Sequence, residues 1–468
     1  MRPLRRGGGP SGSDLAPASK PLTGLSLSRT ERLHQKLKQL HHGFAAHCEP
    51  ATRYVPALMP STATVFAARA LGVVLAAIGG IWVARALGPE KLGISTLVFA
   101  FVTFVGGLTS LNQNYNFVRR GKNQPTSTSL EELVGDVFSL RLGLVLILLA
   151  AGLVGVSLIN VGSEWYLAIA AGVLLALLQS NDAGWVLQLK DRMPWLFIAI
   201  SVQSALAGAL SIALIRPNWP AGSDLAMGCL GALAAFIISW WSACGGWPPG
   251  FRVSIKGFLR GLSLLRGGRW LALMGVGGLL VSTAELPMIS ALASVEELGV
   301  YRAALQFINV INPFLPLFFY RLYPQLIDLQ REASDELLQT QFRALGKVFL
   351  FGIPLAVLAF VLAPWVYPLV FGPAFSGASL PFAILFAGKV VSVGANIFMW
   401  GGFACHRDRE VVLSTLAIAC LSLGLNWLLI PRSGLVGAAM VSLTAQFLLL
   451  STYMAVVVRS RQPHLDVR

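Results

Sequence analysis

The sequence predicts an all-α polytopic membrane protein with about 12 transmembrane helices, arranged as two six-helix bundles around a central cavity. Its 468 residues are 55% hydrophobic and only 12% charged, whereas a soluble domain carries roughly 25% charged residues. The apolar residues form runs of about 20, which as helix cross a hydrocarbon core of ~30 Å. Helix also satisfies its own backbone hydrogen bonds in lipid. A duplicated junction, described below, indicates two bundles.

Twelve apolar stretches are long enough to serve as spans. The fourth is the shortest, and a longer version of it extends toward Trp185. In order, the stretches cover residues 62–84, 93–111, 137–158, 165–179, 195–215, 225–241, 270–293, 300–320, 348–370, 380–404, 411–430 and 435–458.

Basic residues alternate between the two sides of these spans. One set of connecting segments holds 28 of the 36 Lys and Arg residues, and the opposite set holds five, with Arg302 among them. The positive-inside rule makes the basic side cytoplasmic, which places both termini in the cytoplasm of a multi-pass inner-membrane protein. The net charge of +15 therefore reflects membrane orientation rather than binding of nucleic acid.

The duplicated junction joins two spans in each half of the chain. Residues 88–93 (GPEKLG) resemble residues 294–299 (SVEELG), and Glu90 lies 206 residues before Glu296. Six spans, an even number, separate the copies. We therefore predict a parallel repeat, with a transport site at the seam between the halves.

Two further pairs of turns support the repeat. Residues 216–217 resemble residues 431–432 at an offset of about 215, and Asp191 with its basic neighbours resembles Asp408 at an offset of 217.

The repeat divides the chain into five parts. We predict a disordered and partly amphipathic cytoplasmic extension (1–60), an N-terminal bundle (61–245), a cytoplasmic amphipathic linker (246–269), a C-terminal bundle (270–458) and a cytoplasmic tail (459–468). The linker places Ile255, Leu259 and Leu262 on one face and basic residues on another, which suits the inner headgroup layer. A translation start at Met59 is the alternative to a native extension.

Apart from Arg302, which we count with the connecting segments, four charged residues lie inside predicted spans, where a charge usually faces a cavity or a partner. They are Arg69, Arg141, Glu285 and Lys389. Arg69 and Arg141 either line the cavity or extend to the cytoplasmic surface, and Glu285 either couples transport to an ion or forms an internal salt bridge. Three cations against one anion predict a cavity that attracts a phosphate or an acidic sugar.

Polar and aromatic residues close to the spans add candidate sugar contacts, with interface caps and ordinary packing as the alternatives. We predict Asn112 and Asn114 as cavity residues within a polar group at the end of the second span. The full group is Asn112, Gln113, Asn114 and Asn116, and the aromatic candidates are Trp270, Phe314, Phe318, Phe319 and Tyr320.

The chain has no HExxH, GxSxG or P-loop motif, so we predict no enzyme and no cofactor. Its five cysteines show no CxxC spacing, and the His and Cys residues between positions 34 and 48 have no fixed geometry, so we predict no metal site. Energy for transport then comes from an ion gradient or from the substrate's own gradient.

Several stretches in order resemble the polysaccharide transporter (O-antigen flippase) family of the multidrug/oligosaccharidyl-lipid/polysaccharide exporter superfamily. They are residues 84–93 (ARALGPEKLG), 117–120 (FVRR), 294–301, 369–375 (LVFGPAF) and 429–439. The resemblance covers roughly residues 60–458. It implies two six-helix bundles around a central cavity and the flipping of an undecaprenyl-diphosphate-linked oligosaccharide to the outer leaflet. The family often has an Asp-Arg pair in the seventh span, where this chain has Glu285 and Leu286.

We therefore expect a flippase for a polyprenyl-diphosphate-linked oligosaccharide that works by alternating access in surface polysaccharide biosynthesis. Arg69, Arg141 and Lys389 would bind the diphosphate or acidic sugars, and Glu285 would couple a proton or sodium ion. Expected partners are this substrate, membrane lipids, and a polysaccharide polymerase or export protein. A cation-coupled drug exporter and a membrane glycosyltransferase or ligase are the alternatives.

Overall fold

The computed structural model describes residues 60–111, 113–122, 127–158, 162–244, 253–265, 268–312 and 334–460, together with Leu326 and Leu329. The predicted extension before residue 60 and the tail after residue 460 lie outside the described residues. Within these ranges every regular element is a helix. We refer to residues 60–244 as the N half and to residues 269–460 as the C half.

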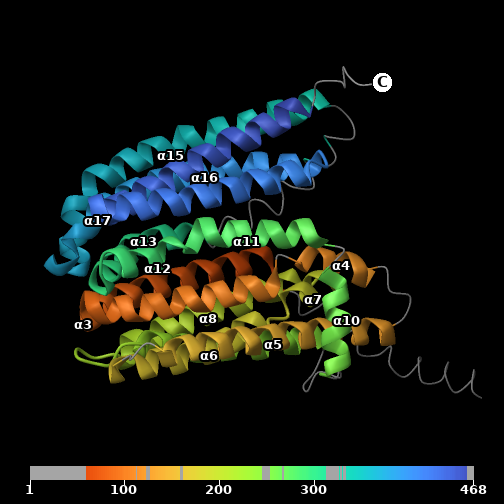
Figure 1. Ribbon diagram of the computed structural model, residues 1–468, viewed down its shortest axis with the longest axis horizontal. Helices are drawn as coiled ribbons and strands as arrows, with labels where there is room; N and C mark the ends of the chain where they lie inside the picture. Colours follow the sequence, from red (N-terminus) through yellow and green to blue (C-terminus); the bar gives the residue numbers. More distant parts are fainter. Residues whose placement is uncertain are drawn as a thin grey trace, which may run out of the picture. The chain divides into compact units, whose positions relative to one another are not determined.

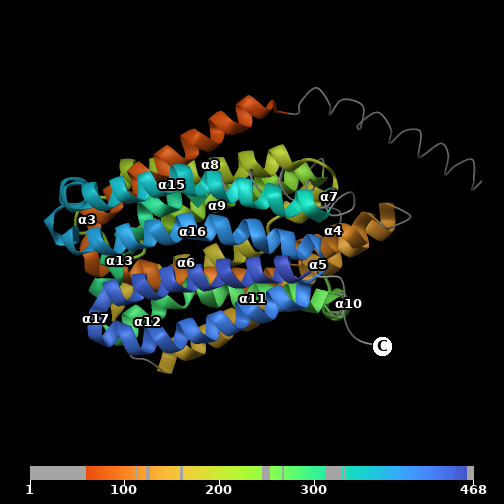
Figure 2. The ribbon, with the colours of Figure 1, turned by 90° about the horizontal axis from the view of Figure 1, so that it is seen from above.

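The helices of both halves run roughly along one direction (Figures 1 and 2). The N half contains α3 (Thr62–Ser110), α4 (Asn114–Lys122), α5 (Ser127–Leu158), η2 (Ser163–Trp165), α6 (Tyr166–Ser180), α7 (Gly184–Leu189), α8 (Met193–Leu214) and α9 (Ser223–Cys244). After α10 (Ile255–Leu265), the C half contains α11 (Arg269–Thr283), α12 (Glu285–Leu292), α13 (Val295–Ile311), α15 (Ser334–Phe371), η5 (Pro373–Ala378), α16 (Ser379–Ala404) and α17 (Asp408–Arg459).

The predicted spans are helical throughout the described part of the chain. Nine segments there are long and apolar enough to cross a membrane. The segments formed by α3 and α17 each hold two spans, divided by kinks at Gly88 (φ 76°) and Gly434 (φ 54°). The described 17 residues of α13 belong to the remaining span. The protein is therefore a multi-pass helical membrane protein.

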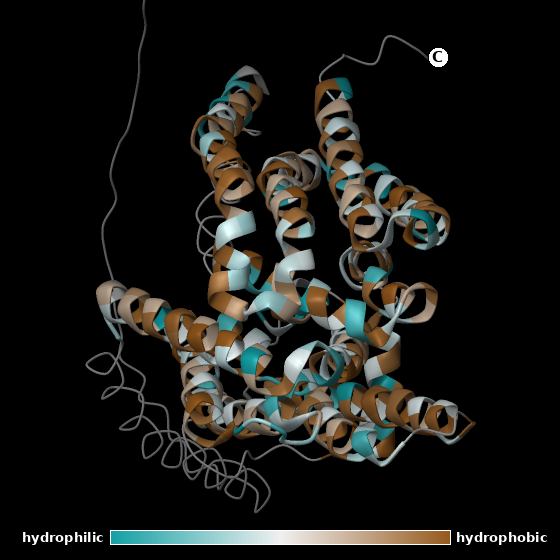
Figure 3. Ribbon diagram, turned by 90° about the vertical axis from the view of Figure 1, so that its left-hand side faces the viewer, coloured by the Kyte–Doolittle hydropathy of each residue, from teal (hydrophilic) through white to brown (hydrophobic). Residues whose placement is uncertain are grey.

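The helix surfaces suit a lipid environment. Hydrophobic residues colour most of each helix in Figure 3. Large apolar side chains are exposed along both halves, including Leu71, Ile147, Phe351, Trp365 and Trp427. Such a surface is stable in lipid, where the tails are as apolar as the side chains.

Matching turns confirm the duplication in the backbone. Between α7 and α8 the amide of Arg192 donates to the carbonyl of Leu187 at 2.8 Å. Between α16 and α17 the amide of Arg407 donates to the carbonyl of Gly402 at 3.0 Å. Both bonds span five residues and close the end of a helix in the same way, at an offset of 215 residues.

This offset corrects the predicted pairing of Asp191 with Asp408. The left-handed residue of the first turn is Asp191 (φ 54°), and its counterpart is His406 (φ 57°). The prediction matched two aspartates, whereas the turn requires a left-handed residue directly before the arginine. The sequence pairing was therefore wrong by two residues.

The linker helix α10 runs across the direction of the other helices (Figure 1). Its Gly257 and Gly261 pack against α5, and Arg260 forms a salt bridge with Asp136 of α5 at 2.8 Å. This hydrogen-bonded contact with Asp136 raises the pKa of the Arg260 guanidinium. The predicted apolar residues Ile255, Leu259 and Leu262 remain exposed.

Candidate functional site

Two neighbouring polar cavities extend along the N half. The basic-end cavity, about 570 Å³, is lined by α4, α6, α7, α8 and α9 near the turn that holds Arg192. The junction-end cavity, about 330 Å³, is lined by α3, α6, α8, α9 and the facing helix α13 near residues 88–93. Gln179 and Gln203 line both cavities. We call the two cavities together the polar path.

The basic-end cavity is organised by Arg141. This side chain is 2% exposed, so it does not extend to the membrane surface. Its Nη2 donates to Asn114 Oδ1 at 2.6 Å, and its Nη1 donates to the carbonyl of Asp182 at 3.2 Å. Asn114 and Asp182 line the cavity, whereas Arg141 stands behind them. Arg141 therefore positions two lining residues and does not itself face a ligand.

The carbonyl of Asp182 is free for Arg141 because the helix is interrupted there. α6 ends at Ser180 and α7 begins at Gly184. The Asp182 carboxylate accepts a hydrogen bond from the Gly184 amide at 2.6 Å, and the carbonyl of Asn181 accepts one from Trp240 Nε1 at 2.9 Å. Interrupted spans with exposed backbone groups are typical of transporter binding sites.

The junction-end cavity holds charges of both signs. Asp224 of α9 and Arg302 of α13 line it and interact electrostatically. Arg302 lies 5.1 Å from the centroid of the Phe99 ring, a cation–π distance. The Oδ1 atom of Asp224 is buried, and no described residue gives it a hydrogen bond. The halves thus contribute opposite charges to one cavity.

Gln179 and Gln203 lie within the α6 and α8 spans, between the charged ends of the path. Neither side-chain amide has a hydrogen-bond partner among the residues that the structure describes. Both side chains are half-buried where they line the cavities. The two amides are therefore available to polar groups that enter the path.

Glu285 lies at a break in the seventh span. α11 ends at Thr283 and α12 begins at Glu285, because Pro287 has no amide to donate back to Thr283. Glu285 is 7% exposed and lies beside the hydroxyl of Tyr301 on α13. The salt bridges of the described residues, Arg260–Asp136 and Arg407–Glu410, do not include Glu285.

The other predicted cations do not join the polar path. Lys389 is half-buried on α16 in the C half, and it forms no hydrogen bond or ion pair with any described residue. Arg69 is 8% exposed near the start of α3, and its buried Nε has no hydrogen-bond partner in the described part of the chain. Neither side chain is among those that line the two cavities.

The predicted polar group at the end of the second span divides into two roles. Asn114 lines the basic-end cavity, while Asn112 lies outside the described residues. Gln113 donates to the carbonyl of Gly268 at 2.7 Å, and Asn116 donates to that of Leu264 at 3.2 Å. These two amides fasten the second span to the linker. Of the aromatic candidates only Trp270 is described, and Arg269 lies 5.7 Å from its ring.

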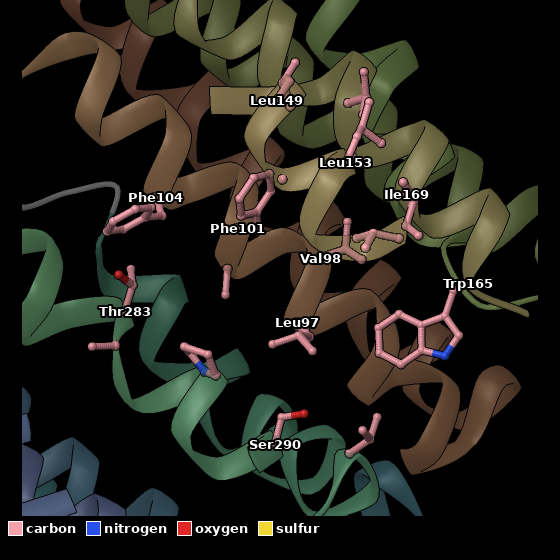
Figure 4. A pocket seen from close by; sticks show the side chains of 18 of the residues that line it. Leu97, Val98, Phe101, Phe104, Leu149, Leu153, Trp165, Ile169, Thr283 and Ser290 are labelled. Carbon is pink, nitrogen blue, oxygen red and sulfur yellow. The ribbon is translucent and has the colours of Figure 1, made fainter. Parts of the chain in front are cut away.

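A third cavity differs from the polar path in its chemistry. It has a volume of about 700 Å³ and lies between α3, α5 and α6 of the N half and α11 and α12 of the C half. Phe101, Phe104, Leu153 and Trp165 point into it, together with Thr283 and Ser290 (Figure 4). We call it the apolar pocket.

Four residues of the path were not predicted from the sequence. Gln179 and Gln203 are uncharged, and the polar candidates taken from the sequence were the charged residues inside spans and the amides at the end of the second span. Asp224 and Arg302 lie within two turns of a span end, and Arg302 was counted with the loops. In the structure Arg302 is part of α13, so this assignment was wrong. The available signal was a glutamine inside an apolar span, and whether its amide is paired depends on how the neighbouring helices pack.

Solved structures of transporters share this fold. An inward-facing multidrug resistance MATE family transporter of the MOP superfamily matches with a TM-score of 0.65 and 13% identity, over 84% of this chain and 96% of that chain. The lipid II flippase MurJ in an inward closed conformation matches with a TM-score of 0.65 and 12% identity, over 84% and 89%. A MOP superfamily transporter from Pyrococcus furiosus matches with a TM-score of 0.57 and 12% identity, over 86% and 96%.

Sequence comparison gives the family. A search of curated proteins finds no match. The model of the polysaccharide biosynthesis protein family matches residues 60–330, which is more than half of the chain. The chain therefore belongs to the polysaccharide biosynthesis protein family, and it has the two-lobed helical fold of the MOP superfamily transporters.

Proposed function

We propose that this protein carries a polyprenyl-diphosphate-linked oligosaccharide across the cytoplasmic membrane by alternating access, for the synthesis of a surface polysaccharide. The family and the fold are those of transporters. The distribution of basic residues supports a cytoplasmic location for both termini, which places the basic-end cavity toward the cytoplasm and the junctions toward the outside.

The chemistry of the polar path supports a sugar as the group that crosses. Gln179 and Gln203 each offer a carbonyl oxygen and two N–H donors within a span, and hydroxyl or acetamido groups of a sugar pair with such amides. Asp224 accepts from hydroxyl groups, while Arg302 donates to oxygen atoms. The path thus offers neutral hydrogen-bonding groups between two charged ends.

The charged residues have separate roles in this proposal. Three cations attract the diphosphate or acidic sugars. They are Arg302 at the junction end, Arg69 on α3 and Lys389 on α16. Arg141 holds Asn114 and the interrupted helix in position. Glu285, beside Tyr301 at a broken span, is the candidate for proton or sodium coupling, because broken spans commonly coordinate coupling ions.

The test uses a deletion strain that makes the surface polysaccharide only when supplied with this gene. The double variant Gln179→Leu and Gln203→Leu is expected to lower surface polysaccharide at least about tenfold, since each position loses polar contacts worth about 1 kcal/mol or more. Lipid-linked sugar should accumulate on the inner leaflet at a normal protein level. The control is Gln339→Leu on exposed α15, which should export normally.

Normal export by the double variant, or a deletion with no accumulated lipid-linked sugar, would overturn the proposal. The apolar pocket favours a second candidate, a cation-coupled exporter of small apolar molecules. In that case the deletion raises sensitivity to apolar toxic compounds and leaves the surface polysaccharide intact.

A further inference from the structure

The two copies of the junction meet each other. A Cβ atom added to Gly93 of α3 would overlap the carbonyl oxygen of Val295, and one added to Gly299 of α13 would overlap the carbonyl oxygen of Pro89. Pro89 and Val295 are equivalent in the repeat, as are the two glycines. The contact is therefore reciprocal, as in an interface between copies related by a twofold axis.

Each junction approaches its own half at an equivalent position. In the N half, Lys91 Nζ donates to the carbonyl of Trp219 at 3.0 Å. In the C half, the position equivalent to Lys91 is Glu297, and its Oε2 atom lies near Gly434, the residue equivalent to Trp219 at an offset of 215. No described residue gives this Oε2 atom a hydrogen bond. The junctions meet each other directly through backbone at the glycines.

The crossing lies next to the junction-end cavity. Leu92, adjacent to Gly93, lines this cavity from α3, and Arg302, three residues after Gly299, lines it from α13. Gly93 and Gly299 are both buried. Separation of the two helices at this point would open the cavity toward the junction end of the protein.

We propose that the reciprocal crossing of Gly93 and Gly299 is the gate that closes the polar path at the junction end. This inference rests on the proposed alternating access and does not depend on which substrate crosses. Two backbones in direct contact close a path tightly, and they hold no side chain that must be moved aside. A side chain at either glycine keeps the helices apart and favours the open gate.

The test measures access to the junction-end cavity with a thiol introduced at Gly228. This glycine lines the cavity, and a Cβ there would meet no atom within 4 Å. The full-length chain carries Gly228→Cys after replacement of its five native cysteines by alanine. A membrane-impermeant maleimide is added to sealed vesicles from one face at a time, and the labelling rate is recorded.

Gly93→Leu and Gly299→Leu are expected to raise the labelling rate from the junction face at least about tenfold, as the open state becomes the major population. Labelling from the opposite face should fall. The control is Gly424→Leu on α17, where an added Cβ atom meets no atom within 4 Å, and it should leave both rates unchanged. Gly299→Ala should give a smaller change in the same direction.

Equal labelling rates in the Gly93→Leu, Gly299→Leu and Gly424→Leu variants would overturn the proposal of a gate. If the leucine variants do not fold, the labelling rate of Gly299→Ala is compared with that of the chain that keeps both gate glycines. Equal rates in these two proteins would overturn the gate. A Gly228→Cys thiol that stays unreactive from the junction face while the protein exports normally also overturns the gate. Because labelling needs no saccharide, a moving gate in a protein that exports no polysaccharide would reject only the proposed substrate.

Discussion

Equivalent backbone carbonyls in the two halves accept hydrogen bonds from different side chains. In the N half the carbonyl of Asp182 accepts from Arg141 at 3.2 Å, and 215 residues later the carbonyl of Ile397 accepts from Gln341 at 3.0 Å. Around Asp182 the helix is interrupted, whereas α16 runs through Ile397 without a break. The donor is the neutral Gln341 where the helix continues, and it is the cation Arg141 where the helix is interrupted beside a cavity.

The interiors differ in the same sense. In the described C half a group of aromatic rings packs around Phe307, and one of its members, Phe371, also lines the junction-end cavity. Phe307 contacts Tyr367, Phe371 and Phe382 with ring centroids 5.7, 5.6 and 5.9 Å apart. The equivalents of Phe382 and Phe386 in the N half, 215 residues earlier, are Leu167 and Ala171. The duplication retained the turns, which fix the fold, whereas these interior residues differ between the halves.

The largest effect on stability should come from the aromatic interior. Phe307→Ala removes three edge-to-face ring contacts, and truncation of a fully buried Phe costs about 3–5 kcal/mol. The low end applies here, since Phe307 is only partly buried and lipid solvates the ring in the unfolded membrane state. Thermal unfolding in detergent measures the loss. Phe351→Ala, a residue 73% exposed on α15, is the control and should unfold like the parent.

Equal unfolding temperatures for the two phenylalanine variants would show that the C half is not held by its rings. The ring contacts of Phe307 would then contribute nothing measurable to the stability of the C half.

A smaller effect on stability, with a large effect on transport, is expected at the equivalent carbonyls. Arg141→Met leaves Asn114 and Asp182 without their charged donor, at a cost of about 1.5–3 kcal/mol, and it should abolish export because the basic-end cavity loses its shape. Gln341→Met breaks one neutral bond, at a cost of about 1 kcal/mol, and should leave export intact. Surface polysaccharide and thermal unfolding measure the two consequences separately.

The comparison fails if Gln341→Met stops export as completely as Arg141→Met at an equal protein level. Both halves would then work as sites. Arg141→Lys sharpens the result, because lysine keeps the charge but lacks the planar fork that reaches two partners, and it should restore export only in part.

Much of this arrangement was readable from the sequence. Span length and charge placed the helices, and the GPEKLG and SVEELG stretches located the duplication, because such turns depend on glycine and on local spacing. Arg141 and Asn114 were predicted as separate cavity residues, and the structure joins them by a hydrogen bond. The sequence could not reveal that Arg141 faces Asn114 rather than a ligand, since this depends on the approach of α4, α5 and α7.

The roles of Lys389 and Glu285 remain predictions, and the path itself was missed for a physical reason. A glutamine inside an apolar span reveals a cavity only when the neighbouring helices leave its amide unpaired. Gln341 is the same residue type, yet it is fully buried and bonds the carbonyl of Ile397. Residue identity therefore does not separate Gln203 from Gln341, whereas packing does.

The smallest effect is expected where α10 meets α5, outside both interiors. The Arg260–Asp136 salt bridge has an arginine side chain that is 58% exposed, and water and salt screen such a pair. Arg260→Gln should leave thermal unfolding and export within experimental error. Gly261→Leu should be harmful, because its Cβ would already crowd Leu140 and the carbonyl of Asp136. If Arg260→Gln lowers thermal stability and export more than Gly261→Leu does, α10 is held by charge rather than by close packing. Its exposed apolar residues then do not position it.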